Sequence, residues 1–195
     1  MTSIANDAFQ YCDALTIYGV SGSYAESYAA SRSIPFAAES MPENPTTPVG
    51  LFDYTIEDDE VTITGFSASN CNITIPASIE GYPVTVIAEE AFNDSMLDIF
   101  IPASVTLIEE NAFLCNATGF IVDPANTAYT SVDGVLFTKD MTTLMCYPND
   151  DEERISYDVP EGVTAIAEHA FHYAYYLENV TLPDTLTSIG NYAFD

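Results

Sequence analysis

The chain has 195 residues, of which 30 are Asp or Glu and only 3 are Lys or Arg, so its formal net charge at pH 7 is −27. Such a charge repels phosphate backbones and anionic lipid surfaces, which argues against nucleic acid as a partner. Hydrophobic residues make up 48% of the sequence, which excludes wholesale disorder, and no run approaches about 18 consecutive apolar residues, so no membrane insertion is expected.

The first segment, residues 1–38, is predicted to be the end of a repeat array followed by a cap. It opens on the partial repeat "TSIANDAF" and continues with "LTIYGVSGSYAESYAASRSIPF". Ser23 and Glu26 have the spacing of a capping box, and Tyr24 and Tyr28 share one helical face. These signals predict a short helix whose apolar side covers the open end of a stack of repeats.

A linker and a hairpin are predicted next. Residues 39–50, "ESMPENPTTPVG", contain three closely spaced prolines, a composition typical of an extended linker. From residue 51, apolar and polar residues alternate in "FDYTIEDDEVTITGF", which predicts a β-hairpin over 51–70 with Glu57–Glu60 at its turn. We interpret residues 51–195 as a second repeat array that begins with this hairpin.

One sequence unit recurs from residue 71 onward. It reads "IPASIEGYPVTVIAEEAF" from Ile75, "IPASVTLIEENAF" from Ile101, "VPEGVTAIAEHAF" from Val159 and "LPDTLTSIGNYAF" from Leu182. The last two copies are offset by 23 residues (159 to 182). Self-similarity with a period of about 20–50 residues indicates a solenoid, in which each unit buries its apolar face by stacking on its neighbours. We therefore predict a mainly β fold with short helical corners.

Within a unit, the periodicity is that of short strands. The stretch "LENVTLP" is predicted to place Leu177, Val180 and Leu182 inward and Thr181 outward, with the proline ending the strand. The Ala-Phe pair is predicted to anchor a tight corner. Stacking of units is expected to align the corner phenylalanines in one internal column: Phe92, Phe113, Phe171 and Phe194.

An insertion interrupts the repeats at about 123–158. Asp133-Gly134 lies between "YTSV" and "VLFT", a strong signal for a two-residue β-hairpin turn. The stretch "KDMT" predicts a second turn before "TLMCYP". We expect a small antiparallel insertion that protrudes from one face of the solenoid.

These units resemble the BspA-like leucine-rich-repeat family of bacterial and protozoan surface proteins. "YLENVTLPDTLTSIGNYAFD" and "IPASVTLIEENAFLCN" carry the resemblance most closely. "NTAYTSVDGVLFTKDMTTLMCYP" is similar to an insertion common in that family, and residues 15–36 are similar to its array-ending cap. The resemblance implies a curved leucine-rich-repeat solenoid, secretion or display on the cell surface, and adhesion or protein binding. It supplies no catalytic residues.

The order of the parts departs from the family pattern, because a cap precedes the array. The simplest interpretation is a fragment of a multi-array protein, so the lack of a signal peptide in these residues does not argue against secretion. The amino-terminal piece could then dock on the open carboxy-terminal end, within one molecule or in a neighbour, since exposed strand edges invite pairing. We therefore expect head-to-tail self-association through open solenoid ends as one mode of assembly.

Candidate catalytic and metal-binding residues are few. His169 and His172 lie near Glu168, but HExxH spacing is absent and no third ligand is evident, so surface histidines are expected. Cys146 lies in an apolar strand and is interpreted as an inert core thiol. The four cysteines, Cys12, Cys71, Cys115 and Cys146, lack metal-like spacing and are interpreted as small buried hydrophobes.

Two acidic clusters, Glu57–Glu60 and Asn149–Glu153, could bind calcium. They lack a spaced D-x-D-x-D-G loop and lie at predicted turns, which favours solvated loops. We therefore expect no catalytic residues, no metal site and no cofactor.

The most plausible functional surface is the outward side of the main strand column. Counting back from the prolines, it comprises Asn72, Thr74, Asp98, Phe100, Ser156, Asp158, Asn179 and Thr181. Solenoid curvature is expected to gather these positions into one concave face. Phe100 is either a binding anchor or a residue covered by the insertion, because the equivalent positions carry Thr or Asp.

The sequence favours a non-enzymatic extracellular or cell-surface module that binds a host-cell or extracellular protein or glycan. The first alternative is a structural spacer that projects another domain from the cell envelope. A hydrolase is the distant alternative, because no GxSxG motif or paired nucleophile and base occurs.

Overall fold

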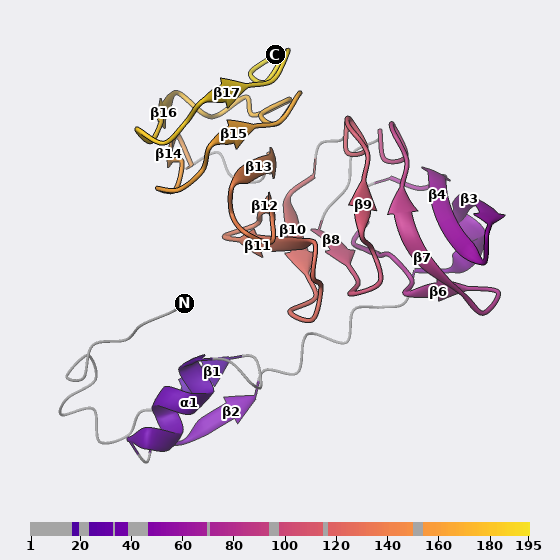
Figure 1. Cartoon of the computed structure of the whole chain (residues 1–195), viewed down its shortest axis with the longest axis horizontal. Helices are drawn as coiled ribbons and strands as arrows, with labels where there is room; N and C mark the ends of the chain where they lie inside the picture. The colour runs from indigo at the N-terminus through magenta and orange to yellow at the C-terminus, as the bar shows by residue number, and fades with distance from the viewer. Residues whose placement is uncertain are drawn as a thin grey trace. The chain divides into compact units, whose positions relative to one another are not determined.

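The computed structural model describes residues 17–19, 24–32, 34–38, 47–69, 71–93, 98–114, 117–149 and 154–195. The chain divides into two compact units, residues 1–44 and 45–195, and each is described by itself (Figure 1). Several predicted features lie outside the described residues: the partial repeat at 2–9, Cys12, Ser23, linker residues 39–46, Cys115 and acidic residues 150–153. No helix in the described ranges is long and apolar enough to cross a membrane.

The described residues of the first unit form two short strands and one helix. β1 (Ile17–Gly19) and β2 (Phe36–Ala38) pair in parallel, and α1 (Tyr24–Ser31) lies between them in the sequence. Tyr28 and Ala29 of the helix are buried. The predicted helix is therefore confirmed, whereas its role as a cap on a repeat stack stays a prediction.

The second unit begins with a single 3₁₀ turn, η1 (Val49–Leu51), and an antiparallel hairpin. The hairpin consists of β3 (Phe52–Glu57) and β4 (Glu60–Phe66). Asp58 and Asp59 form its two-residue turn with positive φ angles of 52° and 63°, as a type I′ turn requires. The acidic side chains at this turn are exposed.

Two parallel ladders follow, as expected when each unit of a solenoid contributes one strand to each side. One ladder consists of β5 (Ile73–Thr74), β8 (Asp98–Ile101) and β10 (Gly119–Val122). Its residues alternate between buried and partly exposed, with Ile99 and Ile101 at 0% exposure on either side of Phe100. This is the predicted period of two.

The other ladder consists of β4, β7 (Tyr82–Ile87) and β9 (Leu107–Ile108). β6 (Ser78–Ile79) pairs with β7 in antiparallel fashion through a Glu80-Gly81 turn, both of whose residues have positive φ. This extra hairpin accounts for the longer first unit, "IPASIEGYPVTVIAEEAF".

The insertion lies within the stack and does not protrude from it. β11 (Tyr129–Val132), β12 (Val135–Thr138) and β13 (Thr143–Cys146) form an antiparallel meander, with the predicted Asp133-Gly134 turn between the first two. β13 then pairs in parallel with β15 (Ala165–Ile166). The expectation of a protruding hairpin is wrong because the last insertion strand supplies the ladder strand on which the next unit stacks.

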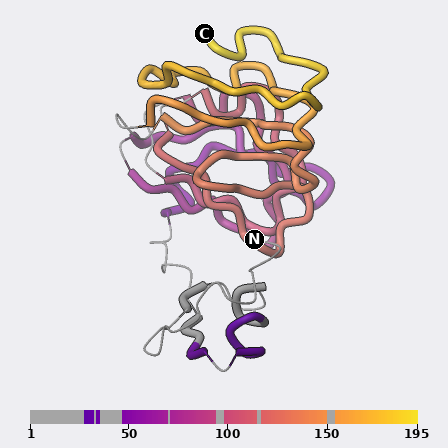
Figure 2. Tube along the Cα trace, turned by 90° about the vertical axis from the view of Figure 1, so that its left-hand side faces the viewer, coloured from indigo at the N-terminus to yellow at the C-terminus, as the bar shows by residue number. Residues whose placement is uncertain are grey.

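The remaining units form a parallel ladder on each side: one extends from β13, and the other is a separate pair of strands. β15 pairs with β17 (Ser188–Ile189), and β14 (Ser156–Asp158) pairs with β16 (Asn179–Thr181), both in parallel. Figure 2 shows the coils of residues 45–195 stacked one on another, ending with the yellow carboxy-terminal coil. The predicted mainly β solenoid with units of about 23 residues is therefore confirmed.

β12 is a partition between two hydrophobic cores. Leu136 belongs to the core of the first units, whereas its neighbours Val135 and Phe137 belong to the core of the last units. All three side chains are fully buried. Successive side chains of a strand point to opposite faces, so one strand can serve a core on each side.

The corners repeat one backbone feature that the sequence pattern did not predict. In each complete unit the residue before the Ala-Phe pair has a positive φ, between 52° and 59°. These residues are Glu90, Asn111, His169 and Tyr192. The backbone N–H of the phenylalanine in one corner donates to the carbonyl of the alanine in the next corner along the stack. The Phe92 N–H donates to Ala112 at 2.9 Å, and the Phe171 N–H donates to Ala193 at 2.7 Å.

Candidate functional site

The eight predicted binding residues lie on or beside the strands of two separate ladders. Asn72 precedes β5, and Thr74, Asp98 and Phe100 lie on β5 and β8. The other four lie on the separate β14–β16 pair: Ser156, Asp158, Asn179 and Thr181. The insertion meander separates the two ladders (Figure 1), and the expectation of a single concave face stays a prediction.

The outward row of the first ladder is partly apolar. Thr74 pairs with Phe100, and Phe100 pairs with Ile121 of β10, so the three lie side by side in register. All three are partly exposed, and neither Phe100 nor Ile121 belongs to the two hydrophobic cores. This row therefore offers an apolar stripe on an otherwise acidic chain.

Polar side chains flank this stripe at the start of the strands. Asn72 Oδ1 accepts a hydrogen bond from the backbone N–H of Asp98 at 3.3 Å, and Thr118 Oγ1 donates to Asp98 Oδ1 at 3.2 Å. Asp98 Oδ1 also lies 3.1 Å from where a Cβ on Gly119 would stand. These contacts fix the Asp98 carboxylate beside the stripe.

The outward row of the second ladder is polar. Ser156 pairs with Asn179 and Asp158 pairs with Thr181, and all four side chains are exposed. Their strand neighbours Tyr157 and Val180 face the second core, as the alternation predicts. Leu182 lies on the same side as Val180 and Phe194, as predicted for an inward residue, and the three line one hollow. It is 43% exposed because no described strand pairs with the outer side of β16.

Ile121 was missed by the sequence reasoning. In two earlier units the proline directly follows a buried isoleucine, as in Ile75-Pro76 and Ile101-Pro102, whereas Asp123 separates the buried Val122 from Pro124. Counting back from the proline is therefore one residue out of register in this unit. The alternation in "GFIV", with Phe120 and Val122 buried, is the signal that identifies Ile121 as outward.

The candidate histidines stand at one corner of the solenoid. His169 and His172 stand at the corner after β15, with ring centroids 5.3 Å apart, and His169 Nε2 lies 3.9 Å from Glu168 Oε1. Among the described residues, no three His, Cys, Asp or Glu side chains are placed to hold a metal ion. His169 is partly buried and stacks on Tyr192, with 5.4 Å between centroids, so the positive-φ corner rather than a ligand set explains its position.

Tyrosine hydroxyls in the described residues are perturbed by their surroundings. Burial, with the neighbouring Tyr147 and Asp133, raises the pKa of Tyr157 to about 12. Burial also raises the pKa of Tyr129, against the opposing effect of its hydrogen bond from the Ile108 N–H. Both groups stay neutral at physiological pH and serve packing and hydrogen bonding.

Three solved bacterial proteins are similar to the chain. The pneumococcal vaccine antigen PcpA is 18% identical, with 77% of this chain and 67% of that chain covered and a TM-score of 0.46. A leucine-rich cell surface protein from Faecalibacterium prausnitzii is 19% identical, with 76% and 73% covered and a TM-score of 0.45. A leucine-rich-repeat protein from Eubacterium ventriosum is 15% identical, with 72% and 60% covered and a TM-score of 0.43.

The chain thus spans about two thirds of the length of these solved proteins. No curated protein gives a significant match. The family model for the BspA type leucine-rich repeat region matches residues 50–140 and 147–195 in six copies. The chain belongs to the BspA-type leucine-rich-repeat family.

Proposed function

We propose that this chain is part of a non-enzymatic, secreted or cell-surface repeat module that binds proteins or glycans of a host or neighbouring cell. The observation that carries the proposal is the outward row Thr74, Phe100 and Ile121, three partly exposed side chains held in register by a rigid parallel ladder. Rigid presentation of an aromatic and an aliphatic side chain reduces the entropy lost on binding.

The composition of this row supports recognition by contact. Aromatic side chains are enriched among the residues that dominate binding energy, and an apolar centre with polar neighbours is the usual anatomy of an interface. Asp98 and Thr118 supply the polar neighbours here. The acidic surface of the chain favours partners with basic or neutral surfaces and disfavours anionic ones.

The test is a binding screen of the full-length protein against a glycan array and a panel of extracellular proteins. Binding to each ligand found is then measured again with the double variant Phe100→Ser and Thr181→Lys, which alters both outward rows. Leu107→Ser is the matched control, because Leu107 is an equally apolar, 47% exposed side chain on the opposite ladder. Loss of binding in the double variant alone supports the outward rows as the binding surface.

Retention of binding in the double variant redirects attention to the insertion. A complete absence of ligands in the screen supports the alternative function, a spacer that projects another domain from the cell envelope. Where the double variant loses binding, the single variants Phe100→Ser and Thr181→Lys assign the contact to the first or the second ladder.

A further inference from the structure

The unit formed by the insertion turns its corner with two residues fewer than the other units. Leu144 of β13 pairs with Ile166 of β15, and the Tyr147 N–H donates to the carbonyl of Ala170, as the Phe171 N–H donates to Ala193. Strand and aromatic corner are thus three residues apart in the insertion unit (144 to 147) and five in the next unit (166 to 171). The shortened corner leaves space between the corners on either side of it.

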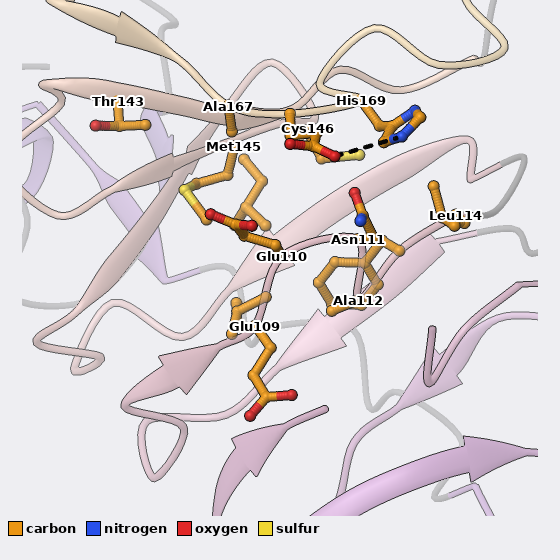
Figure 3. A pocket seen from close by; sticks show the side chains of 14 residues that line it. Glu109, Glu110, Asn111, Ala112, Leu114, Thr143, Met145, Cys146, Ala167 and His169 are labelled. Atoms are coloured by element: carbon orange, nitrogen blue, oxygen red, sulfur yellow. Dashed lines mark ion pairs between the residues drawn. The ribbon is translucent and has the colours of Figure 1, made fainter. Parts of the chain in front are cut away.

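A cavity of about 260 Å³ lies at this place (Figure 3). It is bounded by the corner after β9, by β12 and β13, and by the corner after β15. Ile108, Phe113, Leu136 and Met145 contribute apolar wall. The volume lies just below the roughly 300–1,000 Å³ of pockets for drug-sized ligands, which suits one side chain better than a larger molecule.

Two buried polar atoms at this cavity have no hydrogen-bond partner among the described residues: Asn111 Oδ1 and His169 Nδ1. Asn111 and His169 hold equivalent positions, each before an Ala-Phe pair and each with positive φ. In Figure 3 the Asn111 side chain points toward Cys146 and His169 across the space left by the short corner. Buried polar atoms without partners are rare in folded proteins, and each calls for an explanation.

Acidic side chains supply the charged groups of the cavity lining. Glu168 contributes one carboxylate, whose Oε1 lies 3.9 Å from His169 Nε2. Glu110 adds a second carboxylate to the lining. Glu109 is already engaged, because its carboxylate accepts from the Glu89 N–H at 2.9 Å and points away in Figure 3.

No cation of residues 45–195 neutralises this site. The two in that range are Lys139 and Arg154, which donate to the carbonyls of Pro124 and Asp133, and neither is among the described lining residues. A complementary ligand therefore carries a positive charge and several N–H donors at the end of an apolar stem. Lysine and arginine side chains have this build.

We propose that the cavity binds one basic side chain, arginine or lysine, presented by a partner protein. The aliphatic stem lies against Phe113 and Met145, and the cationic group faces Glu110 and Glu168. Asn111 Oδ1 is covered in the unbound structure, and a rotation of the Asn111 side chain on binding brings it to the cationic group. The site lies at the corners of the units and not on the outward rows of the strands. It is therefore independent of the binding surface proposed above, and either can fail alone.

The test uses the fact that the chain has only two histidines. The ring protons of His169 are followed by NMR during titration with N-acetyl-L-arginine amide, after assignment with the His172→Gln variant. N-acetyl-L-lysine amide is the second cationic probe, and N-acetyl-L-citrulline amide is a neutral probe of nearly the same shape. The expected result is a saturable shift of the His169 signals with both cationic probes and none with the citrulline probe.

Charge-matched variants locate the binding. The double variant Glu110→Gln with Glu168→Gln is expected to lower the affinity for the arginine probe by roughly fivefold or more, because partly desolvated charge pairs are lost. Glu57→Gln with Glu161→Gln removes the same charge from exposed positions outside the lining and is expected to leave the affinity unchanged. Asn111→Gly removes the acceptor at a backbone angle that glycine tolerates, and is also expected to weaken binding.

Three results overturn the proposal. They are no His169 shift with the cationic probes, an equal shift with the citrulline probe, and equal weakening in the pocket and control variants. The last would show attraction to the acidic surface as a whole. Circular dichroism of each variant establishes that the fold is retained.

Discussion

The ring of Tyr147 stacks on that of Phe171, with centroids 5.0 Å apart and planes inclined by 25°. Phe171 stacks in turn on Phe194, at 4.7 Å and 12°. Tyr147 thus stands in the corner position that phenylalanine holds in the next two units. The insertion therefore contains a modified repeat unit, which explains how the solenoid continues through it.

The aromatic column has unequal members, and we expect unequal costs of truncation. Phe171 is 2% exposed and contacts aromatic rings on both sides, so Phe171→Ala is expected to lower the free energy of unfolding by about 3–5 kcal/mol. Phe194 is 50% exposed, so Phe194→Ala is expected to cost roughly half as much or less. Urea denaturation of the two variants measures the difference, and equal losses would contradict the exposure of Phe194.

The single column of phenylalanines expected from the sequence is in fact two columns. Phe92 stacks on Phe113 at 5.4 Å, but Phe113 next meets Phe120 edge-on at 5.1 Å, and the second column starts at Tyr147. The repeat pattern could not show this break, because "TLMCYP" lacks the Ala-Phe signature and has a shorter corner. Local periodicity predicted the strands on both sides of the break and not the packing across it.

The hairpin signal in the sequence also depends on neighbouring residues alone. The Asp133-Gly134 turn was predicted correctly because an Asp-Gly pair readily adopts the two positive φ angles of a type I′ turn. The position of β12 between two hydrophobic cores was not predicted. It depends on which units pack against Leu136 and Phe137 once the coils have stacked. Counting back from the prolines predicted the outward positions of the rows apart from Ile121, but their separation into two ladders follows from the insertion.

The positive φ before each Ala-Phe pair can be tested at Glu90, where φ is 55°. Glycine adopts this conformation without strain, so Glu90→Gly is expected to raise the free energy of unfolding by up to about 1 kcal/mol. Glu89→Gly is the matched control: it removes the same charge from an exposed neighbour that lacks a positive φ, and is expected to destabilise by about 0.5–1 kcal/mol. In thermal unfolding, the melting temperature of Glu90→Gly should lie above that of the parent protein and that of Glu89→Gly below it. Shifts in the same direction for both variants would refute the corner geometry.

Asn126 links the start of the insertion to the preceding unit and is 1% exposed. Its Nδ2 donates to the carbonyls of Pro102 and Val105, and its Oδ1 accepts from the N–H groups of Ala128 and Tyr129. Asn126→Asp replaces the double donor with an acceptor facing two carbonyls, and is expected to cost about 3 kcal/mol or more at neutral pH.

The exposed Asn179 on β16 supplies the control for that substitution. Asn179→Asp makes the same chemical change where no buried carbonyl faces the side chain, and is expected to alter stability by less than about 0.5 kcal/mol. Chemical denaturation of both variants is the measurement. A small effect of Asn126→Asp would mean that the insertion is not anchored through this side chain.

The last prediction concerns alkaline pH and Tyr157. Its pKa is about 12 in the folded protein against an ordinary value of 10.0, because burial disfavours the phenolate. The unfolded chain therefore loses this proton first, so the stabilisation is complete below pH 10 and is lost as the pH rises toward 12.

Tyr157→Phe keeps the ring packed against Tyr147, at 5.0 Å, and removes the hydroxyl. Between pH 9 and 12 its free energy of unfolding is expected to fall less steeply than that of the parent, whereas Tyr175→Phe, at a 72% exposed position, should follow the parent curve. Parallel curves for Tyr157→Phe and the parent would show that the Tyr157 hydroxyl is not linked to folding.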